Sequence, residues 1–154
     1  PVSEANINQD PEAADFVFRS GIPLTMVGLD VTTRTLLTTK ETQKWRDLGR
    51  FAGQKYADIV DYYIDAYKVT SPHLGGCALH DPLAVGVAVE PSLVTTLALD
   101  MKVDTEGPYA GRTIGDETKV NNPNPISKAA IGVNKDKFLD EFMEKLTKLF
   151  AEAN

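Results

Sequence analysis

A histidine and an aspartate stand side by side at positions 80 and 81, directly before a proline and a run of apolar residues. Proline fits the first position of a helix, where its missing N–H costs nothing, so Pro82 predicts a helix start with Asp81 as its cap. A carboxylate there lies beside the positive end of the helix and stays ionised, which suits a hard metal ion. His80 is expected just outside the helix, and histidine is the residue type best suited to donate a proton at neutral pH. The pair therefore predicts a metal ligand and a proton donor in one pocket.

These residues and others nearby also have ordinary structural interpretations. Taken alone, an aspartate before Pro82 is more often only a helix cap, and a loop histidine often only bonds to backbone. Cys77 is the single cysteine and invites a thiol nucleophile, but a small buried residue is the favoured interpretation. His73 is taken as a loop residue. We expect Tyr63 in the core and Asp116 at the surface.

The composition indicates one folded domain and excludes several classes of partner. The chain has 154 residues, of which 42% are hydrophobic and 25% are charged, which is the profile of a globular protein. A net charge of −6 opposes binding to nucleic acid phosphates. No apolar run reaches the length of a membrane span, and the first residues are polar, unlike a signal peptide. We therefore expect a cytoplasmic protein that binds neither membranes nor nucleic acid.

The amino-terminal third predicts a helix followed by a strand. Asp10 and the proline after it suit a helix cap and a first turn, so a helix is expected over 11–20, ending at Gly21. The apolar segment 24–29 predicts a buried strand, with residues 30–32 at its carboxyl end. In open α/β sheets this edge binds ligands.

The remaining patterns complete an α/β fold. Apolar residues at steps of three and four predict helical structure over 42–67, broken near Gly53. Further expected elements are a loop over 69–76, a helix over 82–89, a strand over 97–103 with a hairpin partner within 109–116, a strand over 129–133 and an amphipathic helix over about 138–149. We therefore expect a mostly parallel sheet flanked by helices, with a small β-hairpin.

Five short motifs, in this order, resemble the inosine-uridine preferring nucleoside hydrolases. They are Glu4-Ala5-Asn6, Asp10-Pro11-Glu12-Ala13-Ala14, Leu29-Asp30-Val31-Thr32, His80-Asp81-Pro82-Leu83-Ala84-Val85 and Pro91-Ser92-Leu93. The similarity spans essentially the whole chain but matches only the carboxyl-terminal half of the family, because the family's amino-terminal aspartate motif DxDxGxDD has no counterpart. The resemblance implies that residues 1–154 are the carboxyl-terminal portion of one nucleoside hydrolase domain, whose partner is the missing amino-terminal half.

The resemblance also implies an activity and a set of site residues. The activity is calcium-dependent hydrolysis of the N-glycosidic bond of ribonucleosides to ribose and free base. By analogy, Asp81 is a Ca²⁺ ligand that also contacts the substrate, and Glu4 and Asn6 bind ribose hydroxyls from one face of an extended segment. His80 protonates or orients the leaving base, and Tyr67 is a candidate contact to the base. The family further implies a homo-oligomer, either a dimer or a tetramer.

Two other hypotheses stay open. Calcium takes about six to eight oxygen ligands, and this chain offers one convincing carboxylate, Asp81. A non-catalytic half-enzyme or association module, which needs a complementary amino-terminal segment, is therefore the alternative. A sugar-binding protein or another metal-dependent hydrolase of the same fold is a third hypothesis, against which His80 and Glu4-Ala5-Asn6 argue together. The sequence does not distinguish purine from pyrimidine preference.

Overall fold

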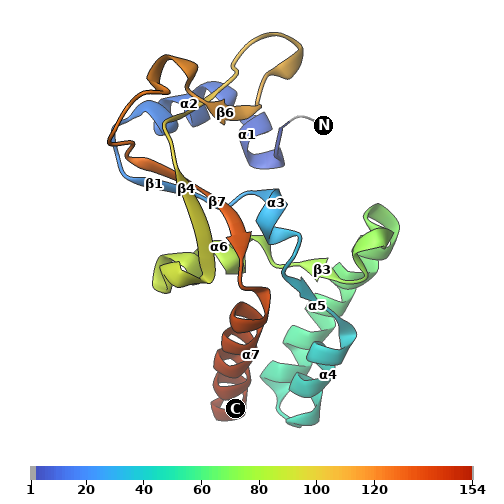
Figure 1. Cartoon of the computed structure of the whole chain (residues 1–154). Helices are drawn as coiled ribbons and strands as arrows, with labels where there is room; N and C mark the ends of the chain where they lie inside the picture. The colour runs from blue at the N-terminus through green and yellow to red at the C-terminus, as the bar shows by residue number, and fades with distance from the viewer. Residues whose placement is uncertain (1–2, 154) are drawn as a thin grey trace. The chain divides into compact units, whose positions relative to one another are not determined.

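The computed structural model describes residues 3–153 and divides the chain into two compact units (Figure 1). In the described part, unit 1 contains residues 3–29 and Thr95–Gly132, and unit 2 contains Asp30–Val94 and residues 133–153. Each unit therefore combines two separate stretches of the chain. None of the helices within residues 3–153 is both long and apolar enough to cross a membrane.

Unit 1 begins with two short helices separated by one residue. Helix α1 covers Ala5–Gln9 and helix α2 covers Pro11–Arg19. Asp10 caps the second helix, because its Oδ1 accepts the backbone N–H of Ala13 at 2.9 Å. Gly21, with a φ of 81°, follows the end of α2. The predicted cap and helix are therefore confirmed.

The sheet of unit 1 has three strands in the order β1-β7-β4. The strands are β1 (Leu24–Met26), β7 (Ser127–Val133) and β4 (Val94–Ala98). β1 and β7 run parallel, and Leu24 lies opposite Ser127. The predicted strand over 24–29 ends early, because the chain turns into helix α3 (Leu29–Thr32).

An antiparallel hairpin pairs β5 (Met101–Val103) with β6 (Thr113–Gly115), which confirms the predicted hairpin. The expected continuous strand over 97–103 is wrong, because β4 ends at Ala98 and β5 starts only at Met101. Phe18 of α2 packs on the two end residues of β5 in a small buried core. This packing joins the helix, the hairpin and the sheet within unit 1.

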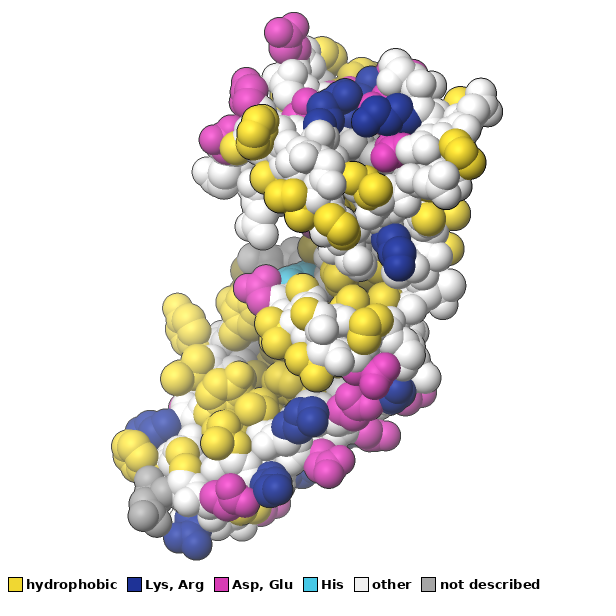
Figure 2. Space-filling model, turned by 90° about the vertical axis from the view of Figure 1, so that its left-hand side faces the viewer, with side chains coloured by type: hydrophobic (Ala, Val, Ile, Leu, Met, Phe, Trp, Pro, Cys, Tyr) yellow, Lys and Arg dark blue, Asp and Glu magenta, His cyan; other side chains and the backbone are white. Residues whose placement is uncertain are grey.

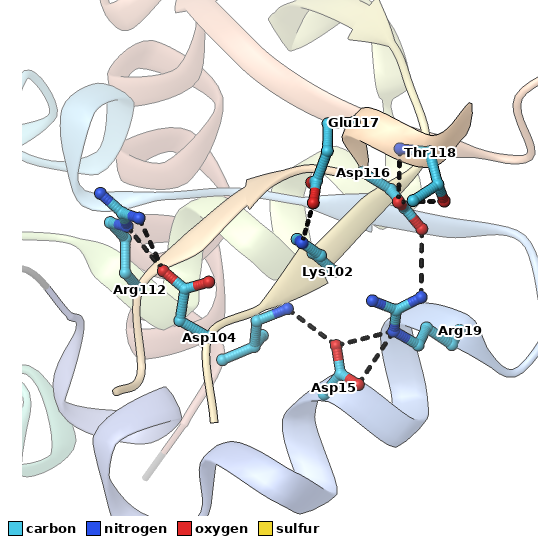
Figure 3. Close-up of polar contacts among 9 residues, drawn as sticks. Asp15, Arg19, Lys102, Asp104, Arg112, Asp116, Glu117 and Thr118 are labelled. Atoms are coloured by element: carbon cyan, nitrogen blue, oxygen red, sulfur yellow. Dashed lines mark hydrogen bonds and ion pairs between the residues drawn. The ribbon is translucent and has the colours of Figure 1, made fainter. Parts of the chain in front are cut away.

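Charged side chains connect α2 to the hairpin (Figure 3). Asp15 accepts the backbone N–H of Val103 at 2.9 Å and the Nε of Arg19 at 2.9 Å. Arg19 also donates its Nη1 to Asp116 at 3.1 Å, and the same carboxylate accepts from the backbone and hydroxyl of Thr118. The bond from the Thr118 hydroxyl keeps the pKa of Asp116 below its usual range. Asp116 is 4% exposed, so its expected surface position is wrong.

Unit 2 consists mainly of helices. They are α4 (Thr39–Asp47), α5 (Phe51–Thr70), α6 (His80–Val89) and α7 (Lys135–Glu152), with an antiparallel pair of short strands, β2 (Leu36–Leu37) and β3 (Cys77–Ala78). The predicted break in the long helical region lies at residues 48–50, where Gly49 adopts a φ of 66°. Gly53 instead marks a close approach of α5 to α4, because a Cβ there would lie 2.6 Å from the carbonyl oxygen of Trp45.

The core of unit 2 is aromatic and aliphatic. Trp45 is fully buried, and its ring lies 5.3 Å from Tyr56 and 5.6 Å from Phe150, in edge-to-face contacts. Gly86 lets α6 approach α7, because a Cβ there would lie 3.1 Å from the ring of Phe138. Four 3₁₀ turns complete the described elements of the two units: η1 (Pro72–Leu74), η2 (Pro91–Leu93), η3 (Gly107–Tyr109) and η4 (Glu117–Lys119).

Candidate functional site

Helix α6 starts two residues earlier than the proline predicts. His80 is its first residue, Leu79 is the N-cap, and Asp81 lies in the first turn. The backbone N–H of Leu83 bonds to the carbonyl oxygen of Leu79 at 3.1 Å, so the first helical bond already encloses His80. The expected cap at Asp81 and the expected position of His80 outside the helix are therefore wrong.

Both ring nitrogens of His80 have hydroxyl partners within unit 2. Thr32 Oγ1 lies 2.7 Å from Nδ1, and the hydroxyl oxygen of Tyr67 lies 2.8 Å from Nε2. Thr32 ends α3 and is buried, Tyr67 lies near the end of α5, and His80 begins α6. A neutral imidazole has one donor and one acceptor nitrogen. The ring therefore connects two hydroxyl groups that can each donate or accept a proton.

The hydroxyl of Tyr67 keeps its proton at neutral pH. Burial is the largest cause that raises its pKa, and a hydrogen bond with Tyr63 raises it further, to about 12. A backbone hydrogen bond from Ala78 acts in the opposite direction. Tyr67 is therefore available as a hydrogen-bond donor, and its ionised form is rare at neutral pH.

Tyr63 extends this group of side chains to the surface. Its ring packs edge-to-face against the ring of Tyr67, with centroids 5.0 Å apart. Tyr63 is 46% exposed, so the expectation that it lies in the core is wrong, whereas Thr32 at the other end is 2% exposed. Hydrogen bonds join Thr32, His80 and Tyr67, and a ring contact adds Tyr63, so the group extends from the interior of unit 2 to its surface. We call these four residues the His80 chain.

Asp81 is an exposed carboxylate next to this chain in sequence. Within residues 3–153 it has no hydrogen-bond or ion-pair partner. The same residues contain no group of three or more His, Cys, Asp and Glu side chains that could hold a metal ion. Because calcium needs about six to eight oxygen ligands, the described residues do not form a calcium site by themselves. Asp81 can supply one ligand and no more.

Glu4 and Asn6 belong to unit 1, whereas Tyr67, His80 and Asp81 belong to unit 2. The expected extended segment is wrong, because Glu4 is the N-cap of α1 and Asn6 lies inside that helix. A helix turns by about 100° per residue, so the alternation that would share one face of a strand does not apply.

The two unit 1 residues differ in their surroundings. Glu4 Oε1 accepts the backbone N–H of Leu29 at 2.8 Å and so holds the start of α3. Asn6 is exposed on α1. Both side chains keep polar atoms that can bind hydroxyl groups, since a carboxylate has a second oxygen and an amide both donates and accepts.

Thr32 and Tyr63 are the members of the His80 chain that sequence reasoning did not assign to the site. Thr32 was placed only at the end of a strand, although its motif, Leu29-Asp30-Val31-Thr32, was already singled out. The adjacent thiol is not a competing nucleophile, because Cys77 is 1% exposed and burial raises its pKa. The interpretation of Cys77 as a small buried residue is confirmed.

Comparisons with known proteins agree with one another. A family model described as inosine-uridine preferring nucleoside hydrolase matches residues 1–140. The chain is 33% identical over 147 residues to the pyrimidine-specific ribonucleoside hydrolase RihA of Escherichia coli, a match that covers 95% of this chain and 47% of the relative. The chain thus spans about half the length of the curated relatives it matches.

Solved structures show the same partial coverage. The purine-preferring ribonucleoside hydrolase from Gardnerella vaginalis is 60% identical, with a TM-score of 0.96, over 98% of this chain and 48% of that one. The plant nucleoside hydrolase PpNRh1 is 28% identical, with a TM-score of 0.83, over 96% of this chain and 48% of that one. These structural similarities confirm the predicted mixed α/β fold.

Proposed function

Because the chain belongs to the inosine-uridine preferring nucleoside hydrolase family, we propose that it forms part of an enzyme that hydrolyses the N-glycosidic bond of ribonucleosides to ribose and free base. The observation that carries this proposal is the position of the His80 ring between the hydroxyls of Thr32 and Tyr67. The names of the relatives support the same reaction class.

The His80 chain suits the protonation of a leaving nucleobase. In the hydrolysis, water forms a new bond to the anomeric carbon of the ribose, and the base leaves with the electron pair of the N-glycosidic bond. A proton donor at the base therefore lowers the barrier. His80 orients the Tyr67 phenol through Nε2, which lies 2.8 Å from the phenol oxygen, and Tyr67 can give its O–H proton to the base. The phenolate then regains a proton from solvent, because its pKa of about 12 lies far above neutral pH. The exposed ring of Tyr63 adds an aromatic surface for the base.

We propose that the sugar and the metal use the remaining predicted residues. Glu4 and Asn6 bind ribose hydroxyls, and Asp81 contributes one Ca²⁺ ligand and contacts the substrate. The support is chemical: a carboxylate and an amide match hydroxyl groups, and Asp81 has no partner of its own within residues 3–153. The other calcium ligands must come from outside the described residues.

The proposed enzyme therefore needs a complementary polypeptide segment. Residues 1–154 would be the carboxyl-terminal portion of one domain, and the partner its amino-terminal half. Groups of hydrophobic side chains at the surface support this proposal (Figure 2). On α5 alone, Ile59, Tyr62 and Val69 are 65%, 80% and 83% exposed, and surfaces of this kind are typical of faces that another chain covers. Assembly into a dimer or tetramer is part of the same proposal.

The test is ribose release from inosine and uridine by the purified chain, alone and refolded with the segment of the Gardnerella vaginalis relative that the chain does not match. The higher identity to this purine-preferring relative makes inosine the first substrate to test. We expect release with calcium that chelator and Asp81→Ala both abolish. The two halves of the Gardnerella protein, recombined in the same way, are the positive control.

The outcomes separate the hypotheses. Release only after addition of the complementary segment supports an incomplete catalytic half. If the Gardnerella halves recombine into an active enzyme and this chain binds the same segment but releases no ribose, the alternative of a non-catalytic association module replaces the proposal. Release that persists in the Asp81→Ala variant would instead remove Asp81 from the calcium site.

A further inference from the structure

The outer end of the His80 chain leaves the position of the ring hydrogen open. The hydroxyl oxygen of Tyr67 lies 2.8 Å from Nε2 of His80. Either atom can be the donor in this bond, because a phenol both donates and accepts. The ring of Tyr67 is in edge-to-face contact with the ring of Tyr63, with centroids 5.0 Å apart.

The inner end of the chain decides the position of the ring hydrogen. Nδ1 of His80 is the only hydrogen-bond partner of Thr32 Oγ1 among residues 3–153. Thr32 is 2% exposed, so its hydroxyl hydrogen has no access to water. If Nδ1 carried the hydrogen, the Thr32 hydrogen would be buried without an acceptor, which is unfavourable. Thr32 must therefore donate, and Nδ1 must accept.

We propose that Thr32 is a positioning residue that selects the neutral tautomer of His80 with hydrogen on Nε2. Thr32 then donates to His80, and His80 donates to Tyr67. Because the Tyr67 oxygen accepts from His80, its own hydrogen stays available, and a nucleobase beside Tyr67 would meet that donor. The inference rests on the proposed function only in this last step, because the tautomer belongs to the chain itself.

The test is the ¹⁵N spectrum of the histidine rings at a pH where both histidines are neutral. The chain contains only two histidines, and His73→Gln assigns the signals. His73 is exposed, so it reports the tautomer mixture in solvent within the same sample. The variants are Thr32→Val, which has nearly the same shape but no hydroxyl, and Thr32→Ser, which keeps the hydroxyl.

We expect a single Nε2–H tautomer for His80 in the wild-type chain and in Thr32→Ser. In Thr32→Val, the ratio of Nδ1–H to Nε2–H should rise roughly fivefold, the change expected when one hydrogen bond is lost. A wild-type ring protonated on Nδ1 would overturn the proposal, as would a Thr32→Val spectrum equal to wild type in a variant with unchanged thermal unfolding. Should Thr32→Val not fold, the wild-type and Thr32→Ser spectra still decide the tautomer. No substrate is used, so failure of the proposed hydrolase activity would leave this result intact.

Discussion

The two units use buried polar groups in different ways. In unit 1, the carboxylates of Asp15 and Asp116 share the guanidinium of Arg19, so the network is built on ion pairs (Figure 3). In unit 2, the His80 chain consists of neutral hydroxyls and an imidazole. The first arrangement holds α2 to the hairpin. In the second, the choice of donor in one hydrogen bond determines the donor in the next.

This difference separates a structural network from a chemical one. The unit 1 network ends on backbone, since Asp15 accepts from Val103 and Asp116 accepts from Thr118. Both carboxylates of this network are therefore bonded within the fold. The His80 chain instead ends at Tyr63, which is 46% exposed. A network that reaches solvent through a donor is the one to examine for catalysis.

The largest effect is expected for His80→Gln in the complemented enzyme. Glutamine keeps polarity, but it has no second ring nitrogen to bond Thr32 and cannot take up a proton. We therefore expect kcat to fall by about a hundredfold or more, the range for lost general acid catalysis. Steady-state ribose release measures it. His73→Gln is the matched control, because His73 is an exposed residue of η1, and it should retain wild-type kcat. Equal kcat in the two variants would mean that the His80 chain, like the network of unit 1, has only a structural role.

A large effect on stability, without an effect on the His80 chain, is expected for Asp15→Ala. This change leaves the buried N–H of Val103 without an acceptor and should lower the free energy of unfolding by about 1–3 kcal/mol. Urea unfolding measures the loss, and the His80 ¹⁵N signals should stay in place.

Asp104→Ala is the control for Asp15→Ala. It removes an ion pair with Arg112, at 2.7 Å between partly exposed side chains, and such pairs contribute about 0–1 kcal/mol. If Asp15→Ala and Asp104→Ala lowered the free energy of unfolding equally, the bond from Asp15 to the Val103 backbone would contribute no more than an exposed ion pair.

The sequence was informative where local chemistry decides the structure. Asp10 and Pro11 predicted a cap and a helix correctly, because the bond to Ala13 spans three residues. The same local rules place the start of α6 two residues late, because backbone bonding from Leu83 to Leu79 outweighs the preference of proline for the first position.

Long-range partners were beyond such rules. Asp116 pairs with Arg19, 97 positions away, and no sequence pattern near Asp116 indicates that partner. His80 and Tyr67 were each singled out, but the bond between them and the bond to Thr32, 48 positions away, depend on how α3, α5 and α6 pack. The residue types of the site could be predicted, whereas its connections could not.

A smaller effect is expected at alkaline pH for Tyr67→Phe. The folded pKa of Tyr67, about 12, lies above the ordinary value near 10, so the stability from its protonated phenol is fully present below about pH 10. This stability is lost as pH rises toward about 12. Tyr67→Phe should therefore make unfolding less dependent on pH in that window, as urea titrations would show. Tyr62→Phe, at a side chain that is 80% exposed, should leave the pH dependence unchanged. A larger change in Tyr62→Phe than in Tyr67→Phe would contradict the assignment of this pH dependence to Tyr67.

The smallest effect on the isolated chain is expected for Asp81→Asn. An exposed first-turn carboxylate without a partner in residues 3–153 stabilises its helix by about 1 kcal/mol or less, and Asp136→Asn in the first turn of α7 should cost about the same in thermal unfolding. The two variants should differ only when the complementary segment and calcium are added, because Asp81 would then be a ligand and Asp136 would not. A calcium-induced rise in melting temperature that disappears in Asp81→Asn alone would identify Asp81 as a calcium ligand. Asp81 would then differ from the carboxylates of unit 1, which are bonded within the fold. Identical calcium responses in both variants would contradict that role for Asp81.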